Sequence, residues 1–257
     1  KENIVTIYTS LWYNVGEFKQ ELLRNPDIKG VSMSTDLGNF GEGTSFKDGS
    51  KVEWTDVDGR TDSLRMGQLW ADGDFVKTFG MQLVKGKLMD DDFNNYWDQG
   101  ETKTAVINET AWRAMKVADP IGMEIRSAWG MPLRIVGVVK DFNFQSMREQ
   151  IKPAYIWYSP EAVQYLYIKI VPERRQQTLA FIKEKFEEFA KRDDAFIKEF
   201  SYQFFSDKLN QNYAREHQQS RMLLFFTVLA IVIAVMGVFG LVALSTEQRT
   251  TEIGIRK

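Results

Sequence analysis

The sequence contains no cysteine and only one histidine, His217. Without cysteine the chain forms no disulfides, no thiolate metal sites and no thiolate nucleophile. A zinc site built on histidine needs several imidazole ligands, and the polar neighbours of His217 indicate a solvated side chain. We therefore expect no catalytic residue, no metal site and no cofactor in this chain.

Common enzyme motifs and a basic surface are also missing. The sequence has no H-E-x-x-H and no G-x-S-x-G pattern. The stretch Gly80 to Leu88 superficially resembles a phosphate loop, but five residues instead of four separate Gly80 from Gly86, and Leu88 stands where Ser or Thr is needed. A net charge of −2 provides no basic surface for nucleic acid. These features argue against nucleotide hydrolysis by this chain and against a nucleic-acid partner.

A long uncharged run lies near the end of the sequence. From Met222 to Leu244, twenty-three residues carry no charge. At about 1.5 Å rise per residue, a helix of this length crosses the roughly 30 Å hydrocarbon core of a bilayer. Residues 222–244 are therefore predicted to form a transmembrane helix in contact with membrane lipid.

Small residues recur along this predicted helix. Ala230, Ala234 and Gly237 share one strip, and Gly240 and Ala243 extend a neighbouring strip. Small residues let a second membrane helix approach closely. We expect another membrane helix to pack against these positions.

The residues before the uncharged run predict a mixed α+β fold. Strand-like segments at 1–10 and 28–35 flank a helical pattern at 15–24, which gives a β-α-β unit with short connections. A helix that crosses between neighbouring strands is the simplest packing of such a unit. The second half repeats this α+β pattern, with strands predicted at 133–139, 154–158, 165–171 and 195–204 and an amphipathic helix at 174–191.

Residues 36–131 differ in composition from both halves. Asp-Gly pairs at 48–49, 58–59 and 72–73 mark tight turns. Short strands are predicted at 52–57, 63–69 and 104–107, and short helices at 74–79 and 109–117. This stretch is interpreted as an inserted, β-rich subdomain.

The segment before the uncharged run is predicted to be helical. Ser206 is its predicted N-cap, and Phe205, Leu209 and Tyr213 form a thin apolar stripe among polar residues. No Pro or Gly interrupts residues 206–236, so this helix is expected to continue into the membrane span. Because the chain starts at Lys1 without Met or a signal-like apolar segment, we expect a span or signal to precede it in the full protein.

Four phrases of the sequence together resemble one family. The closing EQRTTEIGIRK resembles the segment with which a membrane helix of FtsX-like ABC-transporter permeases enters the cytoplasm. FVKTFGMQLVKGKL (75–88), VINETAWRAMKVADPIGMEI (106–125) and LRIVGVVKDFNFQS (133–146) are similar to motifs of the MacB-like periplasmic core domain.

The resemblance implies an α+β extracytoplasmic domain followed by the second membrane helix of a permease. Residues 1–35 and 132–205 would form a porter-like split β-α-β subdomain, and residues 36–131 an inserted β-rich, Sabre-like subdomain. A stalk helix at 206–221, the transmembrane helix at 222–244 and the start of a cytoplasmic coupling segment at 245–257 would follow.

The resemblance also implies a permease subunit of a mechanotransmission-type ABC transporter, without ATPase activity of its own. Its partners would be a cytoplasmic ABC ATPase subunit, a second permease protomer or half, and a periplasmic protein or substrate. Residues 1 to about 221 would be periplasmic and the C-terminal end cytoplasmic, on either side of the inner membrane. The residues implied in the ATPase contact are Glu252, Ile253, Gly254, Ile255, Arg256 and Lys257.

Two other function classes are compatible with the sequence. One is a membrane-tethered sensor whose outer domain signals through the transmembrane helix. The other is an anchored extracytoplasmic enzyme with paired carboxylates, whose separation is a property of the fold. Asn108, Glu109 and Thr110 match the glycosylation pattern, which also arises by chance. The sequence leaves open the substrate, the pairing of permease subunits, and whether the protein transports, extracts or signals.

Overall fold

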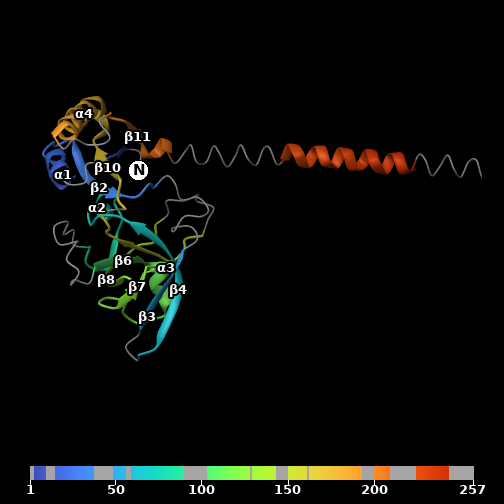
Figure 1. The fold of residues 1–257 in the computed structure, drawn as a ribbon, viewed down its shortest axis with the longest axis horizontal. Coiled ribbons are helices and arrows are strands. Elements are labelled where there is room, and N and C mark those ends of the chain that lie inside the picture. The colour runs from blue at the N-terminus through green and yellow to red at the C-terminus, as the bar shows by residue number, and fades with distance from the viewer. Residues whose placement is uncertain are drawn as a thin grey trace, which may run out of the picture. The chain divides into compact units, whose positions relative to one another are not determined.

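The structure is a computed structural model that describes residues 3–9, 15–37, 49–55, 59–89, 103–127, 129–142, 150–160, 162–192, 199–208 and 224–242. The chain divides into two compact units, Lys1–Leu209 and Asn210–Lys257. Every named strand belongs to the first unit, and the apolar helix belongs to the second (Figure 1).

The first unit contains a four-stranded antiparallel sheet covered on one face by two helices. Its strands are β1 (Ile4–Tyr8), β2 (Ile28–Ser34), β10 (Tyr165–Ile170) and β11 (Tyr202–Phe204), and its helices are α1 (Val15–Leu23) and α4 (Arg175–Arg192). The strand order is β11-β1-β10-β2. The predicted β-α-β unit is present, but β1 and β2 are not neighbours, because β10 lies between them and pairs with both. This is the split β-α-β topology.

Alternating side chains give this sheet two buried faces. Val5 and Ile7 of β1 pack with Phe18 of α1 and Phe186 of α4 in one core cluster. Ile4 belongs to a second cluster on the opposite face of the same strand. Because side chains alternate across a strand, a strand that is apolar at successive positions needs partners on both sides.

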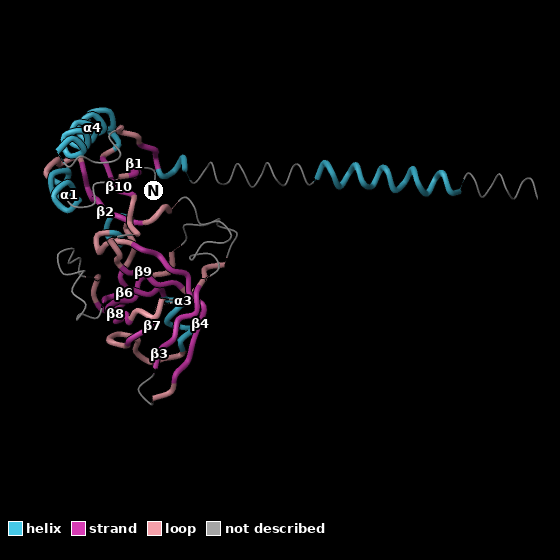
Figure 2. Tube along the Cα trace, in the orientation of Figure 1, coloured by secondary structure: helices cyan, strands magenta, loops and turns pink. Residues whose placement is uncertain are grey.

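The partner on the opposite face is a seven-stranded sheet inserted between β2 and β10. Its strands are β3 (Ser50–Thr55), β4 (Thr61–Trp70), β5 (Leu83–Gly86), β6 (Lys103–Asn108), β7 (Glu124–Arg126), β8 (Pro132–Val139) and β9 (Ala154–Trp157). The order is β5-β8-β6-β9-β4-β3-β7, and β7 also pairs with β8. Six strands therefore close into a barrel, which removes its sheet edges. Strand β5 stays outside as an added edge strand. Figure 2 shows the labelled barrel strands β3, β4, β6, β7, β8 and β9 gathered below the four-stranded sheet.

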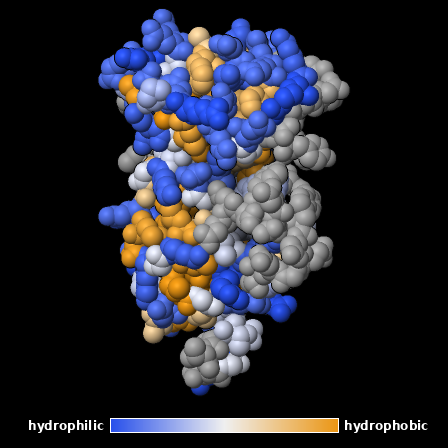
Figure 3. Space-filling model, turned by 90° about the vertical axis from the view of Figure 1, so that its left-hand side faces the viewer, coloured by the Kyte–Doolittle hydropathy of each residue, from blue (hydrophilic) through white to orange (hydrophobic). Residues whose placement is uncertain are grey.

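The barrel encloses a third core cluster to which all six of its strands contribute, with Trp54, Met66, Ile107, Ile125, Ile135 and Tyr155 among its members. On its outer side, Leu69, Val106 and Ile156 pack in the second cluster together with Ile4 and Tyr167 of the four-stranded sheet. The second cluster is thus the core of the interface between the barrel and the four-stranded sheet. Apolar side chains also reach the surface beside the barrel, including Leu83 and Val84 of the edge strand β5. Figure 3 shows apolar surface on this part of the unit.

Strand pairing crosses the boundary predicted at residue 131. Strands β8 and β9 follow that residue, yet they pair with β6 and β4 in the barrel. The sheet that begins in the inserted stretch therefore extends to Trp157. The strand predicted at 195–204 is described only as β11, and residues 193–198 lie outside the described chain.

The part of the second unit that the structure describes is one apolar helix, Leu224–Val242. It has 19 residues and a mean hydropathy of 2.8, and none of its most apolar window is buried within the protein. It is long and apolar enough to cross a membrane, as the uncharged run predicts. Residues 209–223 and 243–257 lie outside the described chain.

Candidate functional site

The residues predicted from sequence to act in coupling lie beyond the described chain. Glu252, Ile253, Gly254, Ile255, Arg256 and Lys257 all fall in 243–257, as does Ala243. Ala230, Ala234, Gly237 and Gly240 lie on the apolar helix, where every described side chain is exposed. No described atom lies within 4 Å of a Cβ placed on Gly237 or Gly240. Packing of a second helix here stays a prediction.

The last described residues before the apolar helix are firmly held in the first unit. We call residues 202–208 the exit segment; it comprises β11 and a helical turn at 205–208. Strand β11 pairs with β1 through Val5 and Phe204. The helical turn already includes Phe205, one residue before the predicted cap at Ser206. Phe205 is fully buried, so it belongs to the core and not to an exposed stalk stripe.

Phe205 joins two other rings from different parts of the fold. Its ring centroid lies 5.5 Å from that of Phe79 and 5.8 Å from that of Tyr167, with interplanar angles of 82° and 88°. Phe79 and Tyr167 also contact each other at 5.4 Å. Edge-to-face pairs of this kind are favourable beyond the area that they bury. We call these three residues the aromatic cluster.

An ion pair lies beside the aromatic cluster. Lys208 of the exit segment pairs with Asp36, which follows β2. The ammonium group of Lys208 also lies 4.5 Å from the ring centroid of Tyr165, a cation–π arrangement. Burial raises the pKa of the Tyr165 phenol to about 12, with a further contribution from the charge of Asp36 and a hydrogen bond with it. The exit segment is thus tied to both β10 and the segment after β2.

Tyr167 positions that segment. Its hydroxyl accepts a hydrogen bond from the backbone N–H of Leu37 at 2.8 Å and donates one to the carbonyl oxygen of Thr35 at 3.0 Å. Burial raises the pKa of Tyr167 well above its ordinary value. The two bonds fix the backbone on either side of Asp36, which presents its carboxylate to Lys208.

The residues that lead into helix α2 (Phe75–Thr78) form ion pairs with Lys19 of α1. The ammonium of Lys19 lies 2.6 Å from Asp72 Oδ2 and 3.0 Å from Asp74 Oδ2. The backbone N–H of Met33 donates to the same Asp72 oxygen at 2.7 Å. Burial alone would lower the pKa of Lys19, but the charges of the two aspartates and their hydrogen bonds raise it above its ordinary value. Asp72 and Asp74 lead directly into α2, so this contact sets the start of the helix.

Two of the sequence motifs cross at a pair of glycines. A Cβ on Gly86 would lie 2.2 Å from the carbonyl oxygen of Val136, and a Cβ on Gly137 would lie 2.1 Å from that of Lys87. Gly86 also has a positive φ of 76°. Only glycine allows backbones to approach this closely, so the pairing of β5 with β8 requires Gly86 of the motif 75–88 and Gly137 of the motif 133–146.

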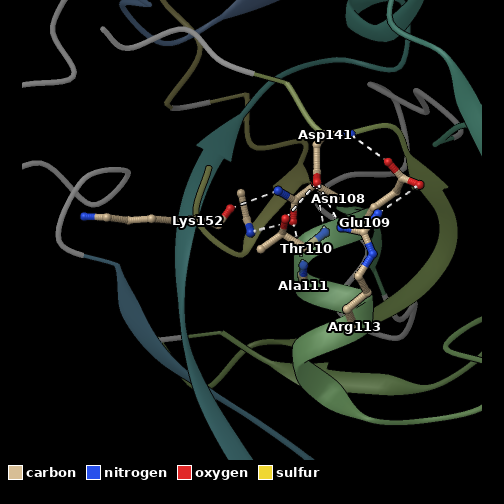
Figure 4. Close-up of polar contacts among 8 residues, drawn as sticks. Asn108, Glu109, Thr110, Ala111, Arg113, Asp141 and Lys152 are labelled. Carbon is tan, nitrogen blue, oxygen red and sulfur yellow. Dashed lines mark hydrogen bonds and ion pairs between the residues drawn. The ribbon is translucent and has the colours of Figure 1, made fainter. Parts of the chain in front are cut away.

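The motif that starts at Val106 contains a buried cap. Asn108 ends β6 and caps α3 (Glu109–Met115) by accepting from the Ala111 N–H at 2.9 Å (Figure 4). The same oxygen accepts from the Ala154 N–H, and the side-chain amide donates to the Lys152 carbonyl, each at 2.9 Å. Asn108 is 1% exposed. Its match to the glycosylation pattern therefore reflects a structural cap that is closed to modification in the folded protein.

A second polar contact joins this motif to the next one. Both carboxylate oxygens of Asp141 accept from Thr110, one from the backbone N–H and one from the hydroxyl, each at 2.8 Å (Figure 4). Glu109 accepts from the Asp141 N–H at 3.3 Å. The polar residues of both motifs thus fasten α3 to the end of β8.

The sequence matches the family described as the MacB-like periplasmic core domain over residues 3–184. The chain belongs to this family. The matched region thus spans β1, β2 and β10 of the four-stranded sheet, the barrel and the first part of α4, whereas β11 and the rest of the exit segment follow it.

Two of the solved structures that match the chain are the following. The chain shares 14% identity with the periplasmic region of MacB from Actinobacillus actinomycetemcomitans, with a TM-score of 0.49, over 82% of this chain and 92% of that chain. It shares 12% identity with the extracellular domain of the ABC-type transporter YknZ from Gram-positive bacteria, with a TM-score of 0.45, over 78% of this chain and 98% of that chain. No curated protein matches the chain.

The sequence pattern does not predict the contacts between the exit segment and the MacB-like core domain. Helical spacing places Phe205 on an apolar stripe of the stalk, because this spacing does not distinguish a buried ring from a half-exposed one. Phe79 and Tyr167 lie 88 positions apart in the chain, and only the fold brings them together. The aromatic doublet Phe204-Phe205, placed just before a polar stretch, is the one local signal of an anchor.

Proposed function

We propose that this chain is a permease subunit of a mechanotransmission-type ABC transporter, in which a separate cytoplasmic ATPase drives export, extraction or envelope remodelling. One observation carries the proposal. A MacB-like periplasmic core domain and an exposed apolar helix of membrane-spanning length occur in the same chain. The absence of a phosphate loop in the sequence is consistent with an ATPase on another polypeptide.

In this proposal the chain has a fixed orientation in the inner membrane. Residues 1 to about 221 are periplasmic, residues 222–244 span the bilayer, and residues 245–257 begin the cytoplasmic coupling segment. Residues 1–35 and 132–205 contribute the four-stranded sheet, α1 and α4, which correspond to the porter-like subdomain, and residues 36–131 contribute most of the barrel, which corresponds to the Sabre-like subdomain. Strands β8 and β9 lie within 132–205 but are strands of the barrel, so they join the two subdomains within one unit.

The partners follow from the same arrangement. The cytoplasmic ATPase contacts residues 252–257, and a second permease protomer or half packs on the small-residue strips of the apolar helix. The core domain faces a periplasmic protein or substrate. An ATP-driven shift of the membrane helix reaches the core domain through residues 206–221, which act as a stalk. The first residues of this stalk, 206–208, belong to the exit segment.

Co-purification of the full-length protein with an ATPase subunit tests the proposal. Glu252→Ala and Arg256→Ala are expected to lower complex formation or coupled ATP hydrolysis. Thr250→Ala is the matched control, because Thr250 lies just before the residues 252–257 that are implied in the ATPase contact. Unchanged values for both charged variants would remove the coupling role. A full-length chain that carries a kinase or helical signalling module in place of further membrane spans would favour a sensor.

A further inference from the structure

The exit segment contacts both halves of the first unit at a single residue. Phe205 touches Phe79, which ends α2, and Tyr167 of β10. Tyr167 belongs to the four-stranded sheet, whereas α2 follows the barrel strand β4. Phe205 therefore fills the interface between the barrel and the four-stranded sheet, and it does not rest on one of them alone.

Helix α2 is the element that separates these two parts. Phe75 and Val76 are buried in the interface cluster with Leu69 and Ile156 of the barrel. On its other side α2 packs on β2, where a Cβ on Gly30 would lie 3.0 Å from the hydroxyl oxygen of Thr78. A displacement of α2 therefore changes how the barrel sits on the sheet.

The sheet face beneath α2 is incompletely bonded. Thr6 and Ser32 flank Tyr167 in one row across three strands. Both hydroxyl groups are buried, and neither has a hydrogen-bond partner among the described residues. A buried hydroxyl without a partner destabilises the closed arrangement, and water would satisfy both groups if the interface opened. This interface thus combines close ring packing with polar groups that favour separation.

We propose that Phe205 couples the exit segment to this interface, so that displacement of residues 205–208 moves α2 through Phe79 and reorients the barrel on the four-stranded sheet. The inference rests on the proposed function, because an ATP-driven movement of the apolar helix supplies the displacement. Lys208 and Asp36 hold the segment in the arrangement seen here. Phe205 is a positioning residue that acts on the interface through its ring contacts.

Spin-label distances in the full-length protein assembled with its ATPase test this inference. The chain contains no cysteine, so spin labels attach within it only at cysteines that are introduced. The double variant Glu184→Cys/Ser63→Cys, at exposed positions of α4 and β4, reports the distance between the four-stranded sheet and the barrel. A second double variant, Glu184→Cys/Leu224→Cys, reports movement of the apolar helix. Distances are compared between the nucleotide-free and the ATP-trapped states.

In the wild-type background both distances are expected to shift on ATP trapping. Phe205→Ala is expected to keep ATPase binding and the change in the Glu184–Leu224 distance. It is expected to lose most of the change in the Glu184–Ser63 distance. Tyr202→Ala is the matched control, because it removes a half-exposed ring from the same segment. If Phe205→Ala fails to fold, Phe79→Leu removes the same ring contact from the α2 side while it keeps an apolar side chain, and the same loss is expected.

The outcomes separate the two proposals. Suppose that in the wild-type background the Glu184–Leu224 distance changes on ATP trapping and the Glu184–Ser63 distance does not: the coupling role of Phe205 is then overturned and the permease function stands. The same conclusion follows if Phe205→Ala and Phe79→Leu both keep the change in the Glu184–Ser63 distance. If no ATPase binds and neither distance responds to ATP, the permease function itself is overturned, and the coupling inference with it.

Discussion

Gly137 of β8 lies so close to Lys87 that a Cβ on the glycine would lie 2.1 Å from the lysine carbonyl oxygen. Gly137→Ala is therefore expected to force the β5–β8 pair apart and to lower the free energy of unfolding by about 3 kcal/mol. Urea unfolding of the detergent-solubilised protein, followed by tryptophan fluorescence, measures this change.

Gly16→Ala is the control for this substitution. Gly16 lies in α1, and no atom of the described residues lies within 4 Å of an added Cβ. Its replacement is expected to leave the free energy of unfolding unchanged or to raise it by about 0.5 kcal/mol. Equal effects of the two substitutions would contradict the close approach of β5 and β8.

Asn108 makes three hydrogen bonds through one side chain. Asn108→Ala removes the cap of α3 and breaks the side-chain hydrogen bonds with the Ala154 N–H and the Lys152 carbonyl. We expect a loss of about 3 kcal/mol in the free energy of unfolding. Asn25→Ala is the comparison, since Asn25 accepts one bond, from the Asp27 N–H, in a turn, and about 1 kcal/mol is expected there. A loss at Asn108 no larger than that at Asn25 would show that the cap does not join α3 to β9.

Lys19 is expected to stabilise the fold strongly because its partner Asp72 is almost fully buried. Lys19→Met leaves that carboxylate without its cation and is expected to cost about 3 kcal/mol. Lys183→Met breaks an exposed pair with Glu187 on α4, so less than about 0.5 kcal/mol is expected. Thermal and chemical unfolding of both variants at neutral pH give this comparison.

The effect of Lys19 should also depend on pH. Its folded-state pKa is raised above the ordinary value of 10.5, so the stabilisation from its charge is complete below pH 10.5 and is lost as the pH rises through the folded-state pKa. The difference in stability between the wild type and Lys19→Met is expected to shrink in that alkaline range. A difference that stays constant there would mean that packing of the side chain, and not its charge, stabilises the fold.

The phenol of Tyr165 is expected to ionise at a higher pH than an ordinary tyrosine. Burial, followed by the charge of Asp36 and the hydrogen bond with it, raises its pKa from 10.0 to about 12. The neutral phenol is favoured by folding, so its stabilising effect is complete below pH 10 and is lost between pH 10 and about 12. Ultraviolet absorbance of tyrosinate should show one fewer late-titrating group in Tyr165→Phe. Asp36→Asn should lower the pKa of Tyr165 only in part, because burial is the larger cause, whereas Asp62→Asn should leave it unchanged.

The elements with strong local patterns were predictable from sequence. The apolar helix lies within the uncharged run at 222–244, and α4 lies close to the amphipathic pattern at 174–191, because burial of one face repeats at the helical period. Strand β8 was visible as a continuous apolar run, since it is buried on both faces.

Closure of the barrel was not predictable. It depends on β7, which has three residues and only one buried side chain, Ile125. Such a strand has no periodicity to detect, and its partners β3 and β8 lie in different parts of the sequence. Nothing in the sequence around Gly86 and Gly137 indicates the close β5–β8 pairing that requires these two glycines. The polar residues of the motif at 106–125 were visible as a pattern, but their roles as caps depend on β9 and Asp141, which only the fold brings near.

The pairing of β1 with β11 has a mechanical consequence. Because the two strands are antiparallel neighbours, the start of β1 at Ile4 lies beside the end of β11 at Phe204. A tensile load applied between these two ends would separate the strands one residue pair at a time, starting at Val5 and Phe204, and would not load all the hydrogen bonds at once. Phe205 and Lys208 lie at the end that is loaded first, so the buried ring of Phe205 and the ion pair of Lys208 resist the first step of this strand separation.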